Sequence, residues 1–166
     1  MSVDPDDLLP SHLTQPQEEI IAYFCDAVRI LGLPRSIGEI YGLLFISAEP
    51  LSIDELVTRL GISKGSASQG LKFLRNLGAV HRTETDRKAY FSPELQLKSL
   101  VGGFISEEVH PHLRSGEDKL ARIHSLIQEE EDPEQLRFYQ ERFHKMERWT
   151  KQAKVVLPLL KHVLKS

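Results

Sequence analysis

Apolar residues recur at the spacing of an α-helix along most of the chain and divide it into a series of amphipathic helices. The clearest run follows Ser36, which has Glu39 three residues later in the pattern of a capping box. The apolar stripe of this run consists of Ile37, Ile40, Tyr41, Leu44 and Phe45. This spacing predicts a helix that begins after Ser36 and buries one face.

Two shorter helices are predicted next. Ser52 and Glu55 repeat the capping-box pattern before a short apolar stripe, and the dipeptide Gly61-Ile62 forms a tight turn after it. Ser63 then caps a further helix that ends at Gly78. The residues predicted to be buried on that helix are Ala67, Gly70, Leu71, Leu74 and Leu77.

The hydrophobic period changes from about 3.6 to about 2 after Gly78, which is typical of β-strands. Two short strands are predicted, at Ala79–Thr83 and Lys88–Ser92, on either side of the turn at 84–87. A helix, a second helix, a tight turn, a third helix and a hairpin form the order of a winged helix-turn-helix. We therefore predict a mainly α fold in which residues 36–92 form a winged helix-turn-helix domain with a two-stranded β wing.

Helical segments flank this domain. Residues 1–13 lack apolar periodicity and are expected to be a loose tail, whereas residues 14–35 form a helix capped by Thr14. Residues 93–166 form further helices, which Gly102-Gly103 and the segment 110–112 are expected to bend or end. Both flanking regions are predicted to be dimerisation helices, and the last also an effector region.

The last helix, after Asp132-Pro133, shows a repeat of 3.5 residues. Such a seam favours packing of helix on helix, including packing against a second subunit, and Pro158 is expected to kink the helix near its end. One position of the seam holds Leu136, Phe143, Thr150, Leu157 and Leu164, and the other holds Tyr139, Met146, Ala153 and Leu160.

Charge is distributed unevenly along the chain. The net charge is −3, yet residues 63–92 carry six basic and two acidic side chains, and residues 133–166 carry eight and three. The basic segment 63–92 covers the third helix of the winged domain and its hairpin, which favours a polyanionic partner such as duplex DNA. Whether the basic last helix also contacts phosphates is left open.

A helical wheel centred on Ala67 places hydroxyls, an amide and cations on the outward face of the helix after Ser63. Serine and glutamine side chains suit base edges or phosphates in a major groove, lysine and arginine neutralise the DNA backbone, and Gly65 allows close approach to a phosphate. The candidate DNA-binding residues are Ser63, Lys64, Gly65, Ser66, Ser68, Gln69, Lys72 and Arg75 in the helix, and Arg82, Arg87 and Lys88 in the wing.

Three segments resemble the GbsR branch of the MarR family of transcriptional regulators: residues 32–44 (GLPRSIGEIYGLL), residues 60–68 (LGISKGSAS) and residues 85–91 (TDRKAYF). The resemblance covers about residues 15–110. It implies a homodimeric, ligand-responsive repressor with Ser66, Ser68, Gln69, Lys72 and Arg87 at the DNA. It also implies a small-molecule effector of the quaternary-amine type.

An aromatic cage for such an amine is one interpretation of the aromatic side chains, with Tyr23 and Trp149 as the candidate ligand-binding residues. Packing in the core or in a dimer is the alternative. We expect no metal site, because His110, His112 and His124 lack a nearby carboxylate cluster, and no cofactor. The single cysteine, Cys25, excludes an internal disulfide and is expected to pack among apolar residues.

The sequence carries no phosphate-binding loop, dinucleotide fingerprint or nucleophile elbow, so we do not expect an enzyme. No apolar run approaches 18 residues and the first residues are acidic, so neither a membrane span nor a targeting peptide is expected, and the expected location is the cytoplasm. The alternative function is a winged-helix module that binds a partner protein without sequence-specific DNA binding.

Overall fold

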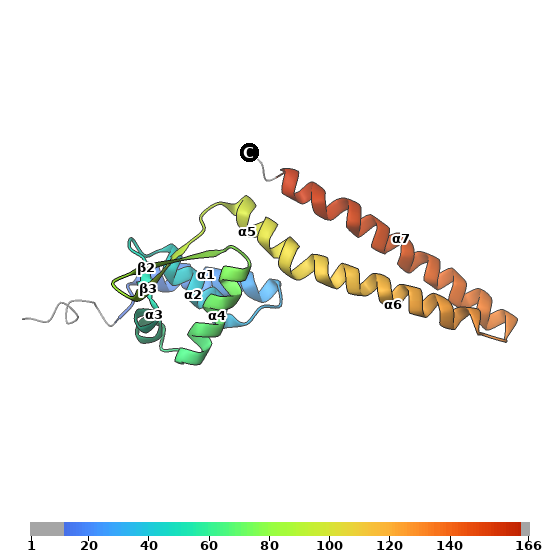
Figure 1. Ribbon diagram of the computed structural model, residues 1–166, viewed down its shortest axis with the longest axis horizontal. Coiled ribbons are helices and arrows are strands. Elements are labelled where there is room, and N and C mark those ends of the chain that lie inside the picture. The colour runs from blue at the N-terminus through green and yellow to red at the C-terminus, as the bar shows by residue number, and fades with distance from the viewer. Residues whose placement is uncertain (1–11, 164–166) are drawn as a thin grey trace, which may run out of the picture. The chain divides into compact units, whose positions relative to one another are not determined.

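The computed structural model describes residues 12–163 and separates the chain into two compact units, Met1–Gln96 and Leu97–Ser166 (Figure 1). Most of the tail predicted at 1–13, and Leu164 of the predicted seam, lie outside the described residues. Each unit is described by itself below.

The first unit is a winged helix-turn-helix domain with one additional helix in front. Its elements in chain order are α1 (Gln15–Ile30), α2 (Arg35–Phe45), β1 (Leu51–Ser52), α3 (Ile53–Leu60), α4 (Lys64–Asn76), β2 (Val80–Thr85) and β3 (Lys88–Pro93). This order confirms the predicted fold class. Three of the predicted helix caps are also confirmed, because Thr14, Ser52 and Ser63 each accept a backbone N–H in the first turn of their helices.

The capping box predicted at Ser36 is wrong. The N-cap of α2 is Pro34, and no side chain caps this helix. Instead, Glu39 accepts a hydrogen bond from the Arg35 side chain, with 2.8 Å between Nε and Oε1. The physical reason is that Pro34 holds an extended backbone conformation, so the helix begins directly after it and Ser36 already lies in the first turn.

The wing belongs to a three-stranded antiparallel sheet of order β1-β3-β2, whereas the sequence predicted only two strands. The short strand β1 pairs Leu51 with Phe91. Strands β2 and β3 pair from Val80 opposite Pro93 to Thr85 opposite Lys88. The wing is therefore longer at its tip than predicted, and its turn consists of two residues rather than four.

The core of this unit is centred on α2, whose Ile40, Leu43 and Leu44 side chains are fully buried. Helix α1 lies very close to α2 because two glycines face it. A Cβ atom at Gly38 would lie 2.6 Å from the Cα of Cys25, and a Cβ atom at Gly42 would lie 2.9 Å from the Cα of Ile21. Any larger residue at these two positions would force α1 away from α2.

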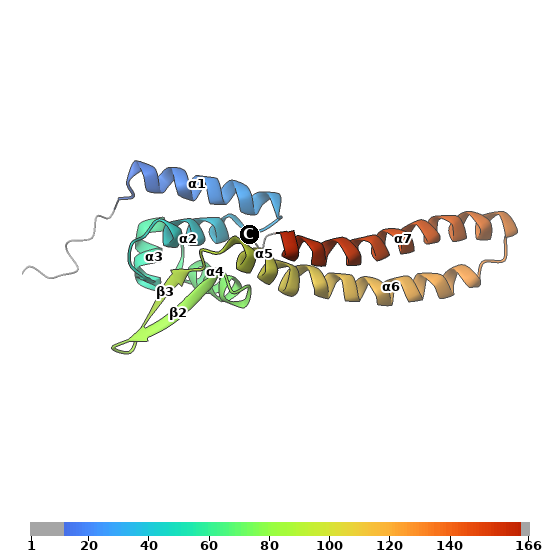
Figure 2. The same cartoon turned by 90° about the horizontal axis from the view of Figure 1, so that it is seen from above.

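The second unit consists of α5 (Leu97–Phe104), a π-helical turn (Ile105–Val109), α6 (His110–Gln128) and α7 (Pro133–Val163). The helical turns continue without a break from Leu97 to Gln128, so the helix does not end at Gly102-Gly103 or at 110–112. It changes from α to π geometry shortly after the glycine pair and returns to α geometry at His110. Helices α6 and α7 run antiparallel as a hairpin (Figures 1 and 2). Pro158 lies inside α7, which continues past it to Val163.

The two positions of the predicted seam on α7 differ in burial. In the first position Phe143 is buried and Leu136, Thr150 and Leu157 are half-buried. In the second position Tyr139, Met146 and Leu160 are exposed. The hairpin therefore buries one half of the seam against α6 and leaves most of the other half as an apolar surface.

Candidate nucleic-acid interface

Helix α4 presents its polar face to solvent because its opposite face is fixed in the core. Ala67, Gly70, Leu71 and Leu74 are buried. Gly70 contacts Ile40 so closely that a Cβ atom there would overlap the isoleucine side chain. The start of α4 follows α3 after a short turn in which Gly61 adopts a left-handed conformation.

The predicted DNA-binding residues are almost all exposed. Among them only Ser66 is half-buried. The exposed ones are Ser63, Lys64, Gly65, Ser68, Gln69, Lys72 and Arg75 on the helix-turn-helix, and Arg82, Arg87 and Lys88 on the wing. Figure 2 shows the β2–β3 ribbon extending away from the helices of this unit.

The side chains of Ser63 and Ser66 form the N-terminal cap of α4. The Ser63 hydroxyl oxygen accepts the Ser66 N–H at 3.1 Å, and the same hydroxyl donates to Ser66 Oγ at 2.9 Å. These contacts fix the first turn of α4. Ser63 and Ser66 therefore position the helix start, whereas Ser68 is exposed farther along the helix.

Three of the predicted cations have partners within the first unit. Lys64 forms an ion pair with Asp54 (3.1 Å), Arg82 forms one with Glu84 (3.2 Å), and Lys88 lies over the Tyr90 ring at 5.8 Å from its centroid. The partner of Arg82 could have been predicted, because residues two apart lie on one face of a strand. No local pattern links Lys64 to Asp54, which comes from the preceding helix.

The remaining three cations, Lys72, Arg75 and Arg87, have no ion-pair partner within residues 12–163, and the Gln69 amide has no hydrogen-bond partner there. Exposed cations without an internal carboxylate partner are free to neutralise phosphate. A primary amide can form paired hydrogen bonds to an adenine edge. Gln69, Lys72, Arg75 and Arg87 are therefore the candidate residues whose polar groups are free to bind DNA.

The wing tip holds Arg87 in an uncommon backbone conformation. Asp86 and Arg87 both have positive φ angles, 51° and 64°. Two-residue hairpin turns of this type usually contain Asn-Gly or Asp-Gly, because a residue with a Cβ atom is strained there. Placing an arginine at this position costs stability and projects a free cation from the end of the wing.

The two candidate ligand-binding aromatics belong to different units. Tyr23 on α1 is 71% exposed and packs edge-to-face on Phe24, with 5.6 Å between ring centroids. Trp149 on α7 is 65% exposed. Neither of these two residues lines the groove described next.

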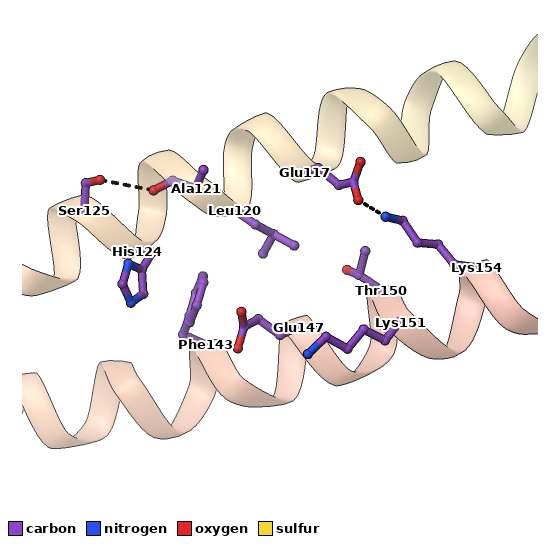
Figure 3. A pocket seen from close by; sticks show the side chains of 10 residues that line it. All are labelled: Glu117, Leu120, Ala121, His124, Ser125, Phe143, Glu147, Thr150, Lys151 and Lys154. Atoms are coloured by element: carbon purple, nitrogen blue, oxygen red, sulfur yellow. Dashed lines mark hydrogen bonds and ion pairs between the residues drawn. The ribbon is translucent and has the colours of Figure 1, made fainter.

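A groove of about 590 Å³ lies between α6 and α7 (Figure 3). Its apolar part includes Leu120 and the buried Phe143, whose ring lies 5.4 Å from the His124 ring. Lys154 forms an ion pair with Glu117 across the groove, whereas the half-buried Glu147 carboxylate has no partner among the described residues. Glu147 is one of three glutamates in the basic last helix, and no pattern in the sequence distinguishes it from ordinary surface residues.

No group of three or more His, Cys, Asp or Glu side chains within the described residues is arranged to hold a metal ion. Cys25 is half-buried with its Sγ 3.8 Å from the Arg35 carbonyl oxygen, and burial raises the pKa of its thiol. No helix in the described part of the chain is long and apolar enough to cross a membrane.

A comparison with known families identifies the central part of the first unit. Residues 31–89 match the family described as the MarR family. This segment is a MarR-family winged-helix domain. The match covers α2 to the first part of β3 and therefore includes all the candidate DNA-binding residues.

A curated relative supports the GbsR branch that the sequence resembles. The chain is 31% identical over 71 residues to the HTH-type transcriptional repressor GbsR of Bacillus subtilis (strain 168). The match covers 43% of this chain and 39% of that protein, so the chain aligns with about two-fifths of the relative's length.

A solved structure described as a transcriptional regulator has a similar fold, with a TM-score of 0.54 and 18% identity. The similarity covers 89% of this chain and 99% of that chain. The helices outside the MarR-type segment therefore also have a counterpart in a known fold.

Proposed function

We propose that this protein is a transcriptional regulator that binds duplex DNA through α4 and the wing. The observation that carries the proposal is the exposed set of Gln69, Lys72, Arg75 and Arg87, which have no partner among the described residues. The first three project from α4, whose opposite face is buried, and Arg87 projects from the wing tip. The MarR-family segment and the relative named a transcriptional repressor support it. By that analogy the protein acts as a repressor.

Selection of bound duplexes from a random library, followed by fluorescence anisotropy, tests this function. If about 6–10 phosphates are neutralised, the affinity should fall by about 10³–10⁵-fold between 50 and 200 mM salt. A selected palindrome should bind more tightly than a random duplex at the same salt concentration. Equal affinity for the two would contradict sequence-specific regulation, and absence of binding would favour the alternative, a module that binds a partner protein.

A homodimer is part of the proposal. The apolar surface left exposed on the α6–α7 hairpin includes a groove of about 340 Å³. Its lining is almost entirely apolar and comes from Ile123, Leu126, Ile127, Phe138, Tyr139, Arg142, Phe143 and Met146. Burial of such a surface against a second copy is favourable. Two recognition helices about 34 Å apart would then contact half-sites about 10 bp apart.

A small-molecule effector of the organic-cation class is the second part of the proposal. The groove in Figure 3 combines an aromatic ring, Phe143, with the unpaired carboxylate of Glu147, and both groups attract a quaternary amine. Calorimetry with choline and betaine tests this idea. Glu147→Gln should weaken binding by about tenfold or more, while Trp149→Ala, outside this groove, should leave it unchanged. Absence of heat with the unmodified protein would contradict the proposed ligand.

A further inference from the structure

Glu94, directly after β3, connects three parts of the first unit through its backbone. Its N–H donates to the Ala79 carbonyl oxygen at 2.9 Å, just before β2. Its carbonyl oxygen accepts a hydrogen bond from the Tyr41 hydroxyl in α2 at 2.5 Å. The residue therefore joins the two strands of the wing to the central helix of the core.

The Glu94 side chain adds two contacts in the same region. One carboxylate oxygen accepts the Gln96 N–H at 2.8 Å, and the other lies 3.4 Å from Nε2 of His81 in β2. The Gln96 N–H and, less strongly, His81 lower the pKa of this carboxyl below its usual range, while desolvation opposes them. The carboxylate thus stays charged at neutral pH and holds both neighbours.

Tyr41 is a rigid anchor for this cluster. It is 6% exposed, and its ring packs against the Phe24 ring at a centroid distance of 4.9 Å. Burial raises the pKa of the Tyr41 hydroxyl, with the Glu94 charge as the second cause, so the hydroxyl remains a donor. The hydrogen bond to Glu94 therefore ties the end of the wing to the most buried part of the domain.

The position of these contacts matters because they lie at the root of the wing, opposite its tip. Val80 pairs with Pro93 at the root, and Thr85 pairs with Lys88 beside Arg87 at the tip. Six strand residues span about 20 Å, so a rotation of about 10° at the root would move the tip by about 3 Å. A displacement of this size is enough to break a hydrogen bond to a phosphate.

We propose that Tyr41, Glu94 and His81 form a wing-root clamp that positions Arg87 on DNA. The inference rests on the proposed DNA-binding function and adds to it a set of positioning residues outside the DNA-contacting surface. Gln96, whose N–H donates to the Glu94 carboxylate, is the last residue of the first unit, so the clamp lies close in sequence to the boundary between the two units.

A double-mutant cycle tests the clamp. Tyr41→Phe keeps the buried ring and removes the hydroxyl that donates to Glu94. We expect it to lower the affinity for a selected operator by about 3–10-fold, the range of one lost hydrogen bond. In an Arg87→Ala background the same change should cost less than about twofold, because the contact that the clamp positions is already absent.

Lys72→Ala provides the matched background, since Lys72 lies on α4 and not on the wing. There Tyr41→Phe should keep its full effect. Equal losses in the Arg87→Ala and Lys72→Ala backgrounds would overturn the clamp while leaving DNA binding intact, whereas absence of binding by the unmodified protein would overturn the proposed function and this inference with it. If Tyr41→Phe does not fold, Glu94→Ala replaces it in the same cycle. This substitution removes the carboxylate contacts to His81 and Gln96, and the expected pattern is the same.

Discussion

Arg87 is the residue at which stability and the proposed function oppose each other. Its left-handed backbone costs about 1–2 kcal/mol relative to glycine-type turns, and the side chain has no ion pair within the first unit to offset this cost. Arg87→Gly should therefore leave the free energy of unfolding unchanged or raise it by up to about 1 kcal/mol.

The same substitution should lower DNA affinity and reduce the slope of log affinity against log salt by about 1, because one phosphate contact is lost. Urea denaturation and anisotropy titrations at several salt concentrations measure the two effects. A variant that is both more stable and equally tight in DNA binding would show that Arg87 does not contact DNA.

Gln69 and Lys72, which are both exposed on α4, differ in the kind of DNA contact that their side chains can make. An amide can pair with a base edge, whereas an ammonium group recognises phosphate without regard to sequence. Lys72→Ala should weaken binding to all duplexes similarly, and Gln69→Ala should relax the preference at one position of each half-site. Affinity measurements on a set of single-substituted operators distinguish these outcomes. A uniform loss for Gln69→Ala would assign its amide to the backbone.

At the scale of elements, the contact between α1 and α2 depends on the absence of side chains. Because a Cβ atom at Gly38 would lie 2.6 Å from backbone of α1, Gly38→Ala should lower the free energy of unfolding by about 1–3 kcal/mol. Gly65→Ala is the matched control in the same unit, since the new Cβ would meet only Ser63 Oγ at 3.9 Å. Urea denaturation of both variants measures the difference, and equal stability would contradict the close packing.

The wing root gives a pH dependence with a defined sign. The pKa of Glu94 is lower in the folded protein than in the unfolded chain, chiefly because the Gln96 N–H donates to its carboxylate. A lowered folded pKa adds stability that is present above the unfolded pKa and is lost as the pH falls through the folded value. Glu94→Gln should therefore be less stable than the unmodified protein at pH 7. Urea midpoints should converge in acid, and a constant difference down to pH 2 would contradict this assignment.

The elements that could be predicted from sequence are those whose signals are local. The caps at Thr14, Ser52 and Ser63 each depend on a side chain within three residues, and all three were predicted correctly. The cap predicted at Ser36 was wrong because Pro34 restricts the backbone before it. The helix therefore begins after the proline and not after the serine. Strand β1 was missed because two residues carry no periodicity, and it exists only through pairing with β3.

In the candidate site, too, features with a local sequence signal could be predicted and contacts between distant residues could not. The outward face of α4 follows from helical periodicity around Ala67, and the structure leaves Gln69 and Lys72 exposed as predicted. The contact between Tyr41 and Glu94 spans 53 residues, and no pattern in the sequence marks it. The turn at the wing tip was predicted to contain four residues instead of two, because Asp-Arg is an unusual pair for a two-residue hairpin turn.

At the scale of the whole molecule, the proposed dimer surface can be tested by using the two faces of α7. Met146 lies on the apolar groove of the hairpin, and Val155, nine residues later, lies two and a half helical turns away and hence on the opposite face. Both side chains are exposed in the single chain, at 38% and 65%. A glutamate at either position has the same charge and helix propensity, so only the location differs.

Met146→Glu should raise the dissociation constant of the dimer by at least about tenfold, because a charge would be buried in an apolar interface. Val155→Glu should leave it unchanged. Sedimentation equilibrium measures both. The loss of the dimer should also remove the preference for a palindrome over a single half-site, because a monomer presents one recognition helix. If both variants remain dimers, the hairpin groove is not the interface, and the exposed apolar residues of α1, such as Ile30, become the surface to test.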